Sequence, residues 1–282
     1  MMRAAQRLVA AVRFFMASPI ALQLLTAGRE LSRALAELSF PAPVAHVYDP
    51  FQYAWASYAA YVRRYGATRK RVVLVGMNPG PFGMMQTGVP FGEVAAVRDW
   101  MGIVEPIRRP VRQHPARPIL GFDCPRSEAS GRRLWCWAAS RFGTASSFFD
   151  AWFVLNYCPL AFLEASGRNL TPDRLRAGPG CALTDACDRH LVDALAALQP
   201  EWAIGIGEFA ERRLRAALQR NRVDAAGASP IKIARILHPS PASPAANRGW
   251  ALAVDRTLAD LGVLPRWTRP VHDLSTLSGE AT

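Results

Sequence analysis

Four residues that can carry chemistry or shape a pocket follow four apolar runs of the sequence. Asn78 comes just after the first run, Asn156 lies in the second near its end, Gly207 ends the third and His238 ends the fourth. A neutral amide can accept a hydrogen bond from a water and hold it in place, although it is too weak a base to remove the proton. An imidazole N–H can stabilise negative charge on a nearby oxygen. A single Asn or His at a strand end is more often a cap or a satisfied core group, but their joint placement favours a site.

The apolar runs are predicted to be strands of one sheet that positions these side chains. Their ranges are 71–77, 151–157, 201–207 and 231–238. Helical patterns separate them, at 94–104, 128–142, 184–198, 208–220 and 243–261. This alternation predicts an α/β fold in a single domain, with a central, mainly parallel four-stranded sheet flanked by helices. Because the carboxyl ends of parallel strands meet at one edge of a sheet, the four residues are expected to converge on one crevice.

A long loop after the first predicted strand has the composition of a binding loop. Residues 74–92 read LVGMNPGPFGMMQTGVPFG. Glycines let the backbone approach a ligand closely, and prolines stiffen the approach. Phe91 stands between Pro90 and Gly92, where it is placed to stack on a flat ring, although most phenylalanines in proteins are core residues. The loop therefore predicts one wall of a binding site.

The charge balance favours a phosphate-rich partner. The chain has 282 residues, with 34 Lys and Arg against 22 Asp and Glu, and a net charge of +12. Arg is far commoner than Lys, and its guanidinium group donates paired hydrogen bonds to phosphate, so nucleic acid is the leading candidate partner. A biased base composition of the gene gives the same balance, so composition alone leaves both interpretations open.

The cysteine pattern indicates no metal, iron–sulfur cluster or other cofactor. The five cysteines include no C-x-x-C pair. The nearest approach to a ligand set, Cys181, Cys187 and His190, precedes or lies on a helical pattern and is interpreted as structural. An odd count argues against a disulfide framework and predicts a reducing compartment.

The two ends of the chain are predicted to lie outside the main domain. Residues 1–38 are expected to be a basic, apolar N-terminal helical extension, which could also be partly disordered. Arg13 and Pro19 interrupt its apolar run, so it does not fit a secretory signal, and a transit peptide is the alternative. The main domain spans 39–265, and 266–282 is expected to be a loose tail. Nothing else in the sequence approaches the apolar length of a membrane span.

Three segments of the sequence resemble motifs of one enzyme family. GMNPGPFGMMQTGVPFGEV, NYCPLAF with SGRNLTP, and HPSPASPAANRGW are similar to segments of the single-strand-selective monofunctional uracil-DNA glycosylases, within the uracil-DNA glycosylase superfamily. The similarity runs from about residue 40 to about residue 265, and the motifs occur in the family's order. It implies a uracil-DNA glycosylase-like domain that flips out and excises uracil, and C5-modified uracil, from DNA. The product would be an abasic site for base excision repair.

The resemblance also implies a role for each motif residue. Asn78 would hold the catalytic water, and His238 would stabilise the departing base. The residues that would bind the base are Met77, Gly80, Phe91 and Asn156. Among these, Phe91 would stack on the extruded base and Asn156 would read the uracil edge.

Two features of the motifs bear on specificity and on DNA contact. Gly80 stands where other uracil-specific enzymes of the superfamily have a Tyr that excludes a 5-methyl group, which implies space near C5. The last motif implies a wedge that enters the DNA, formed by Pro239, Ser240, Pro241, Ala242, Ser243, Asn247 and Arg248. Family members often carry Arg directly after HPSP, where this chain has Ala242.

This reading implies hydrolysis without a covalent enzyme intermediate. The only lysines are Lys70 and Lys232, and neither lies beside the motifs, so a Schiff base with the sugar is not expected. The expected partner is uracil-containing DNA, single-stranded and double-stranded, with no cofactor, no metal or iron–sulfur cluster and no membrane. The protein is expected to be a monomer, in the cytoplasm with the nucleoid if bacterial and in the nucleus if eukaryotic.

Two other function classes remain as alternatives. A catalytically silent nucleic-acid-binding domain that keeps the pocket is the first. The second is a nucleotide or sugar-phosphate enzyme that uses the glycine-rich loop as a phosphate cradle. The sequence disfavours the latter, because it contains neither G-x-x-x-x-G-K-[ST] nor G-x-G-x-x-G.

Overall fold

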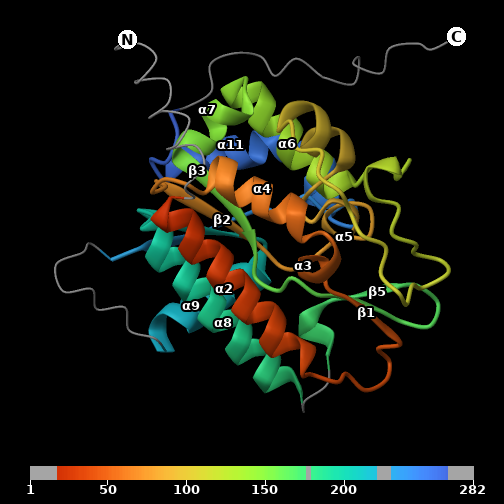
Figure 1. Cartoon of the computed structure of the whole chain (residues 1–282). Helices are drawn as coiled ribbons and strands as arrows, with labels where there is room; N and C mark the ends of the chain where they lie inside the picture. The colour runs from red at the N-terminus through yellow and green to blue at the C-terminus, as the bar shows by residue number, and fades with distance from the viewer. Residues whose placement is uncertain (1–17, 176–178, 221–229, 266–282) are drawn as a thin grey trace, which may run out of the picture.

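The computed structural model describes residues 18–175, 179–220 and 230–265. The expected loose tail, 266–282, lies outside these residues, as do the first seventeen residues of the expected N-terminal extension. The described chain forms a layered α/β structure, with helices on both sides of a central sheet (Figure 1).

The central sheet has four strands that are parallel throughout. They are β2 (Val72–Gly76), β3 (Trp152–Asn156), β6 (Trp202–Ile206) and β7 (Lys232–Ile236). Their order across the sheet is β3-β2-β6-β7. The four-stranded α/β prediction is confirmed, and each predicted range exceeds the strand by one or two residues at its ends. The inner strand β2 is buried along its whole length, as expected of a strand covered on both faces.

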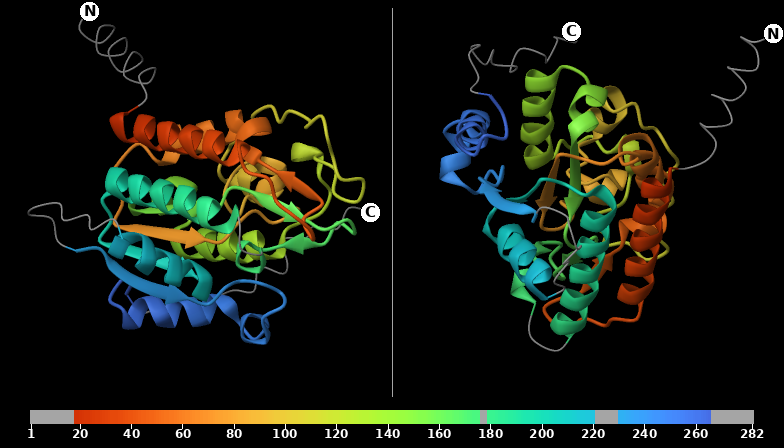
Figure 2. Two further views of the ribbon diagram at one scale, coloured as in Figure 1. Left: turned by 90° about the horizontal axis from the view of Figure 1, so that it is seen from below. Right: turned by 90° about the vertical axis from the view of Figure 1, so that its left-hand side faces the viewer.

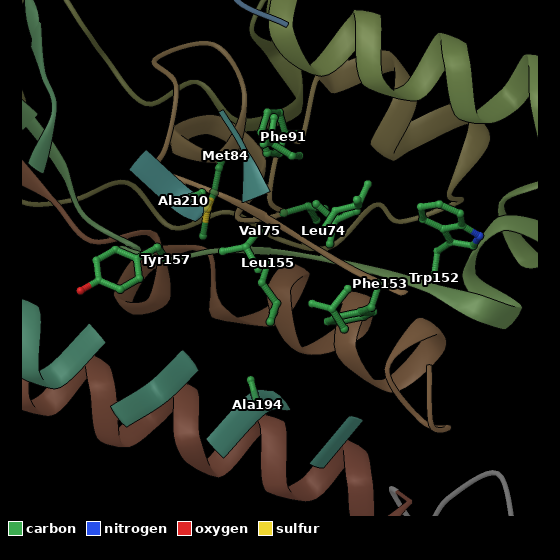
Figure 3. Packing of buried hydrophobic residues seen from close by; sticks show 14 of the residues in the cluster. Leu74, Val75, Met84, Phe91, Trp152, Phe153, Leu155, Tyr157, Ala194 and Ala210 are labelled. Atoms are coloured by element: carbon green, nitrogen blue, oxygen red, sulfur yellow. The ribbon is translucent and has the colours of Figure 1, made fainter. Parts of the chain in front are cut away.

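Two groups of helices cover the sheet (Figure 2, right). On one face lie α8 (Pro179–Leu198) and α9 (Glu208–Arg220), and α2 (Pro19–Ala36) packs on α8. On the other face lie α6 (Ala129–Phe142), α7 (Ala145–Ala151) and α11 (Trp250–Asp260). The core between sheet and helices includes Leu74, Phe153 and Leu155 from the strands, with Ala194 of α8 and Ala210 of α9 (Figure 3).

Helix α2 contributes to the main core. Its residues Leu24, Leu31 and Leu35 are buried and belong to the same apolar cluster as the strands. Ser18 caps the helix by accepting a hydrogen bond from Ala21 N, and Pro19 occupies the first helical position, where a proline costs nothing.

The edge strand β3 is protected by α4 (Trp55–Tyr65). The Tyr61 hydroxyl donates to Val154 O at 3.0 Å and accepts from Val154 N at 3.2 Å. An edge strand presents unpaired backbone groups, and this single hydroxyl satisfies one donor and one acceptor. The Tyr61 ring also stacks on Phe153, with centroids 4.9 Å apart.

Two helix predictions differ from the structure. The range 94–104 is helical only over 94–100, and within it Ala96–Trp100 form a wide-turn helix labelled η1. The range 243–261 is divided into α10 (Pro244–Asn247) and α11, because Gly249 adopts φ of 123°, which breaks a helix. The predicted helices 128–142 and 208–220 match α6 and α9 closely, and the predicted 184–198 lies within α8.

A second, smaller sheet was not expected from the sequence. It has the order β1-β4-β5 and is antiparallel, with β1 (His46–Tyr48), β4 (Ala161–Leu163) and β5 (Asn169–Leu170). It lies toward the end of the molecule to which the parallel strands point (Figure 2, left). The remaining short elements are α3 (Pro50–Tyr53), α5 (Met84–Thr87), η2 (Gly121–Asp123) and η3 (Pro172–Arg174).

Candidate active site

The amide of Asn78 is held in one orientation at the end of β2. Its Nδ2 donates to Leu160 O at 3.3 Å, and Leu160 lies in the segment that follows β3. Because the amide nitrogen of Asn78 faces Leu160 O, its Oδ1 acceptor points away from Leu160. The side chain is partly exposed, so a water can reach it. Asn78 can therefore accept a hydrogen bond from a water and orient it.

The amide of Asn156 is buried and has an open acceptor. β2 and β3 pair in register, which places Asn156 opposite Gly76. Nδ2 donates to Met84 Sδ at 3.2 Å, whereas the buried Oδ1 has no partner among the described residues. A buried amide oxygen without a partner costs about 1–3 kcal/mol, unless a ligand or a water satisfies it. This oxygen is the clearest sign that a polar group binds here.

The ring of Phe91 lies against the same amide. A Cβ on Gly76 would be 2.4 Å from Phe91 Cε2 and 2.5 Å from Asn156 Oδ1, so only glycine allows this approach. Phe91 has φ of 54°, which is rare for an aromatic residue and costs of the order of 1–3 kcal/mol. Trp135 Nε1 donates to Phe91 O at 2.8 Å and fixes this backbone. The ring is 8% exposed, and Figure 3 shows it near Met84 beside the core.

His238 is held as a neutral imidazole in the tautomer that carries its hydrogen on Nε2. Ser240 N donates to its Nδ1 at 3.1 Å, so the remaining ring hydrogen is on Nε2. Burial lowers the pKa of His238 below its usual 6.5, which keeps the ring neutral at neutral pH. Its ring centroid lies 6.3 Å from that of Phe91. Gly207 lies directly beside it: a Cβ there would be 3.2 Å from His238 Cβ. The Nε2–H can donate to an oxygen of a ligand seated against Phe91.

A carboxyl group that the sequence analysis did not identify closes the loop side of this site. Glu128 precedes α6, and its Oε2 is buried without a partner among the described residues. A Cβ on Gly80 would lie 2.4 Å from Glu128 Oε1, and a Cβ on Gly83 1.9 Å from Oε2. The space that was expected beside Gly80 is therefore occupied by Glu128.

Burial, with a smaller effect from the Glu93 carboxylate, raises the pKa of Glu128 from its usual 4.5 to about 7. The protonated Glu128 carboxyl group contributes to the free energy of unfolding. This contribution is fully present below pH 4.5 and is lost as the pH rises through 7. We expect the Glu128→Gln variant, which does not titrate, to gain roughly 2–3 kcal/mol of unfolding free energy relative to the wild type between pH 4.5 and pH 8. Urea unfolding at both pH values measures this gain. A difference that does not depend on pH would contradict the raised pKa.

The last motif forms a protruding segment beside His238. Of the residues assigned to the wedge, Pro241, Ala242, Asn247 and Arg248 are exposed, Ser240 and Ser243 are half-buried, and Pro239 is buried. Bonds within the segment stiffen it: Ala242 N donates to Ser240 Oγ, Asn247 Nδ2 donates to Pro241 O, and the Ser243 side chain caps α10. The segment is thus preorganised in the conformation seen here.

Arg133 of α6 anchors this segment from behind. Its Nη1 donates to Pro239 O at 3.1 Å and to Ser240 O at 3.3 Å, and its Nη2 donates to Asn247 Oδ1 at 2.7 Å. One guanidinium group therefore connects the start and the end of the segment. Sequence analysis missed Arg133, because nothing in its spacing distinguishes it from the many other arginines.

The structure brings Asn78, Asn156, Gly207 and His238 to the carboxyl edge of the sheet, as the strand ends predicted. Phe91, from the loop after β2, lies beside them. Met77 contributes through its backbone, since Cys158 N donates to Met77 O at 2.9 Å and extends the pairing of β2 and β3. The residues that sequence analysis missed are Met84, Glu128, Arg133 and Leu160. The pair of glycines at 80 and 83 was the available signal for Glu128, since small residues leave room for a side chain from elsewhere.

The described part of the chain contains no cluster of three His, Cys, Asp or Glu residues suited to a metal ion. Cys187 and His190, from the grouping considered above, are buried in α8. In the same described residues, no helix is both long and apolar enough to cross a bilayer.

Comparisons with known proteins find relatives that all carry a uracil-DNA glycosylase description. The family model described as "Uracil DNA glycosylase superfamily" matches residues 63–261. A mouse (Mus musculus) protein named "Single-strand selective monofunctional uracil DNA glycosylase" is 46% identical over 239 residues, covering 84% of this chain and 83% of the relative. A Bos taurus protein of the same name is 44% identical over 238 residues, covering 84% and 85%.

A solved structure supports the fold independently. The crystal structure of wild-type Pedobacter heparinus SMUG2 superposes with a TM-score of 0.58 at 16% sequence identity, and the match covers 84% of this chain and 97% of that one. At this identity the likeness concerns the fold alone.

Proposed function

The chain belongs to the uracil DNA glycosylase superfamily, and from this premise we propose that it hydrolyses the N-glycosidic bond of uracil in DNA. The base is flipped from the stack into the site between Phe91, Asn156 and His238, and an abasic site remains. The observation that carries the proposal is Asn156 Oδ1, which is buried beside the Phe91 ring and has no partner in the described part of the chain.

Asn156 is suited to select uracil over cytosine. Its Oδ1 can accept from uracil N3–H, and the second hydrogen of Nδ2, the first being used by Met84, can be donated to O4. Cytosine presents an acceptor at N3 and a donor at its amino group. Asn156 Oδ1 would then face an acceptor, and Nδ2 would face a donor. A site built around such hydrogen bonds rejects a mismatched ring strongly, because its own buried groups remain unpaired.

The hydrolysis itself separates charge, and the two catalytic residues act on the two ends of that separation. The sugar gains oxocarbenium character while the base leaves as an anion with charge on O2. His238 Nε2–H is the donor for O2, and Asn78 Oδ1 positions the water that attacks C1′. Neither residue needs to form a covalent bond.

The two lysines support a monofunctional reaction. Lys70 has a pKa that burial lowers to about 8, which would suit a Schiff base, but it donates to Thr68 and Phe149 O at the amino end of β2. The strand of five residues separates it from the site by about 17 Å. Lys232 begins β7 and pairs with Glu201, also at the amino edge.

We expect the Arg133→Ala variant to lose more activity on duplex DNA than on single strands. Without the guanidinium group, Pro239, Ser240 and Asn247 are no longer connected, and the wedge supports the opened duplex less well. The rate on uracil opposite adenine should fall about tenfold more than the rate on single strands, measured by single turnover. Arg132→Ala is the matched control, since Arg132 is the exposed neighbour of Arg133 on α6. An equal loss on both substrates would mean that Arg133 does not act through the wedge.

A direct assay tests the proposed function. The protein is incubated with a single-stranded oligonucleotide that holds one uracil, and free uracil and alkali-labile sites are both measured. The proposal expects free uracil and strand cleavage that appears only after alkali treatment. Binding without release would support the catalytically silent alternative, and cleavage without alkali would indicate a lyase.

A further inference from the structure

We propose that a pocket lined by three arginines, outside the active site, binds a phosphate group. The pocket lies between the C-terminal half of α2 and the segment formed by α3 and α4, which packs on α2 (Figure 1). Pro106 and Arg108, from the loop that follows η1, complete its wall. Its volume is about 470 Å³, within the range of roughly 300–1,000 Å³ that is usual for small-molecule sites.

The pocket is positively charged, and the residues around it do not balance the charge. Arg29, Arg33 and Arg108 line it, and none of the described residues that line it is an Asp or Glu. Within the described ranges, none of the salt bridges involves these three arginines, whereas Arg71, for example, pairs with Glu201. Three like charges around one pocket favour the binding of an anion.

Contacts in the pocket wall hold two of these arginines in place. The Arg29 guanidinium group lies over the half-buried Trp55 ring, with Cζ 4.3 Å from the ring centroid. Arg108 N donates to Tyr53 O at 2.9 Å, which fixes the loop against α3. A guanidinium group donates hydrogen bonds in a planar fork that matches phosphate. Groups that are already held lose less freedom when they bind a ligand, so this arrangement favours phosphate binding.

The carboxyl group of Asp49 lies behind the pocket wall and is used by other groups. It accepts from Ser32 Oγ at 2.6 Å and from Phe51 N at 2.9 Å, and both of these residues line the pocket. Asp49 itself is buried and does not line it. Burial also raises the pKa of Asp49 above its usual 3.8, because it disfavours the charged form. The three arginines therefore remain available to a ligand.

Tyr53 separates this pocket from the active site. It lines the pocket, and its hydroxyl donates to Met85 O of α5 at 2.7 Å. The sulfur of the preceding residue, Met84, accepts from Asn156 Nδ2. A phosphate in the pocket thus lies beyond one side chain and one short helix from the base site, and it takes no part in the hydrolysis. Its binding can be measured whether or not the protein releases uracil.

Two sources of phosphate fit this chemistry. One is the backbone of a nucleic-acid strand, and the other is a free phosphate compound such as a nucleotide. Both present the same anionic oxygens to the guanidinium groups, so the experiment has one arm for each source.

The first arm titrates inorganic pyrophosphate into the full chain by isothermal titration calorimetry. The second measures the affinity of a uracil-free, single-stranded oligonucleotide of deoxyadenosine by fluorescence anisotropy. Both compare the wild type with Arg33→Gln, Arg108→Gln and the control Arg63→Gln. All three arginines are exposed, so the substitutions do not disturb the core. Arg63 lies on α4, as Trp55 does, but does not line the pocket.

We expect the wild type to bind a single pyrophosphate. Arg33→Gln and Arg108→Gln should each weaken this binding about tenfold, because each removes charged hydrogen bonds, and Arg63→Gln should stay within about twofold of the wild type. If both pocket variants weaken oligonucleotide binding by a similar factor, the phosphate is that of a strand. If oligonucleotide binding stays within about twofold, the source is a free phosphate compound.

Two results would overturn the proposal. One is a wild type that binds no pyrophosphate. The other is pyrophosphate binding that neither pocket variant weakens, or that Arg63→Gln weakens equally, because the anion would then respond to the net charge of the protein and not to this pocket. Failure of the proposed function would appear in a different measurement, as a wild type that releases no uracil.

Discussion

The Asn78→Ala variant is expected to excise uracil about a thousandfold more slowly than the wild type in a single-turnover assay. Asn78 Oδ1 holds the attacking water, and its orientation is set by the bond from Nδ2 to Leu160 O. Removing one preorganised polar group at a reacting centre typically costs a factor of about 10²–10³, and here the nucleophile itself loses its position.

Two controls separate this chemical effect from misfolding or lost binding. Affinity for uracil-containing DNA should change little, because the contacts to the base come from Phe91 and Asn156. Asn78→Asp keeps an oxygen acceptor and should recover part of the rate. A rate for Asn78→Ala within threefold of the wild type would remove Asn78 from the mechanism.

The His238→Ala variant is expected to lose about a hundredfold to a thousandfold in the rate of base release. Its Nε2–H stabilises charge on O2 that develops only in the transition state, so the effect should appear in the rate and not in affinity. The tautomer that this requires is fixed by the bond from Ser240 N to Nδ1.

The pH dependence gives a second test of His238. Because burial lowers its pKa below 6.5, the ring is mainly neutral at pH 6.5 and above, and the mechanism proposed here uses this neutral form. Between pH 6.5 and pH 8, the pH–rate profile of the wild type should therefore have the same shape as that of His238→Ala. A wild-type rate that falls tenfold across this range, with a flat profile in the variant, would show that the imidazolium form is the active one.

The strands and the carboxyl-edge location could be predicted because each strand is a continuous apolar run. Such runs identify buried parallel strands, and parallel pairing alone brings Asn78, Asn156 and His238 to one edge. The strands of the second sheet have only two or three residues, too few for a periodic signal. The kink at Gly249 likewise depends on one dihedral angle within an otherwise helical pattern.

The parts of the site that were missed depend on contacts between distant segments. Glu128 reaches Gly80 and Gly83 from a position more than forty residues away in sequence, and no spacing rule connects them. The expectation of empty space beside Gly80 considered only the missing side chain of residue 80, and the structure fills that space from α6's N-terminal end. Two of the three Arg133 bonds go to backbone oxygens, and Leu160 acts through its own backbone oxygen, so these contacts leave no trace in the residue types.

The central claim is that one pocket, built from the ends of the parallel strands, binds the flipped uracil. A crystal structure of Asn78→Ala with a single-stranded uracil-containing oligonucleotide tests it most directly. The account predicts the uracil ring stacked on Phe91, with N3 and O4 within about 3 Å of the Asn156 amide and O2 within about 3 Å of His238 Nε2. A uracil bound outside this pocket, or bound with its N3 edge turned away from Asn156, would contradict it.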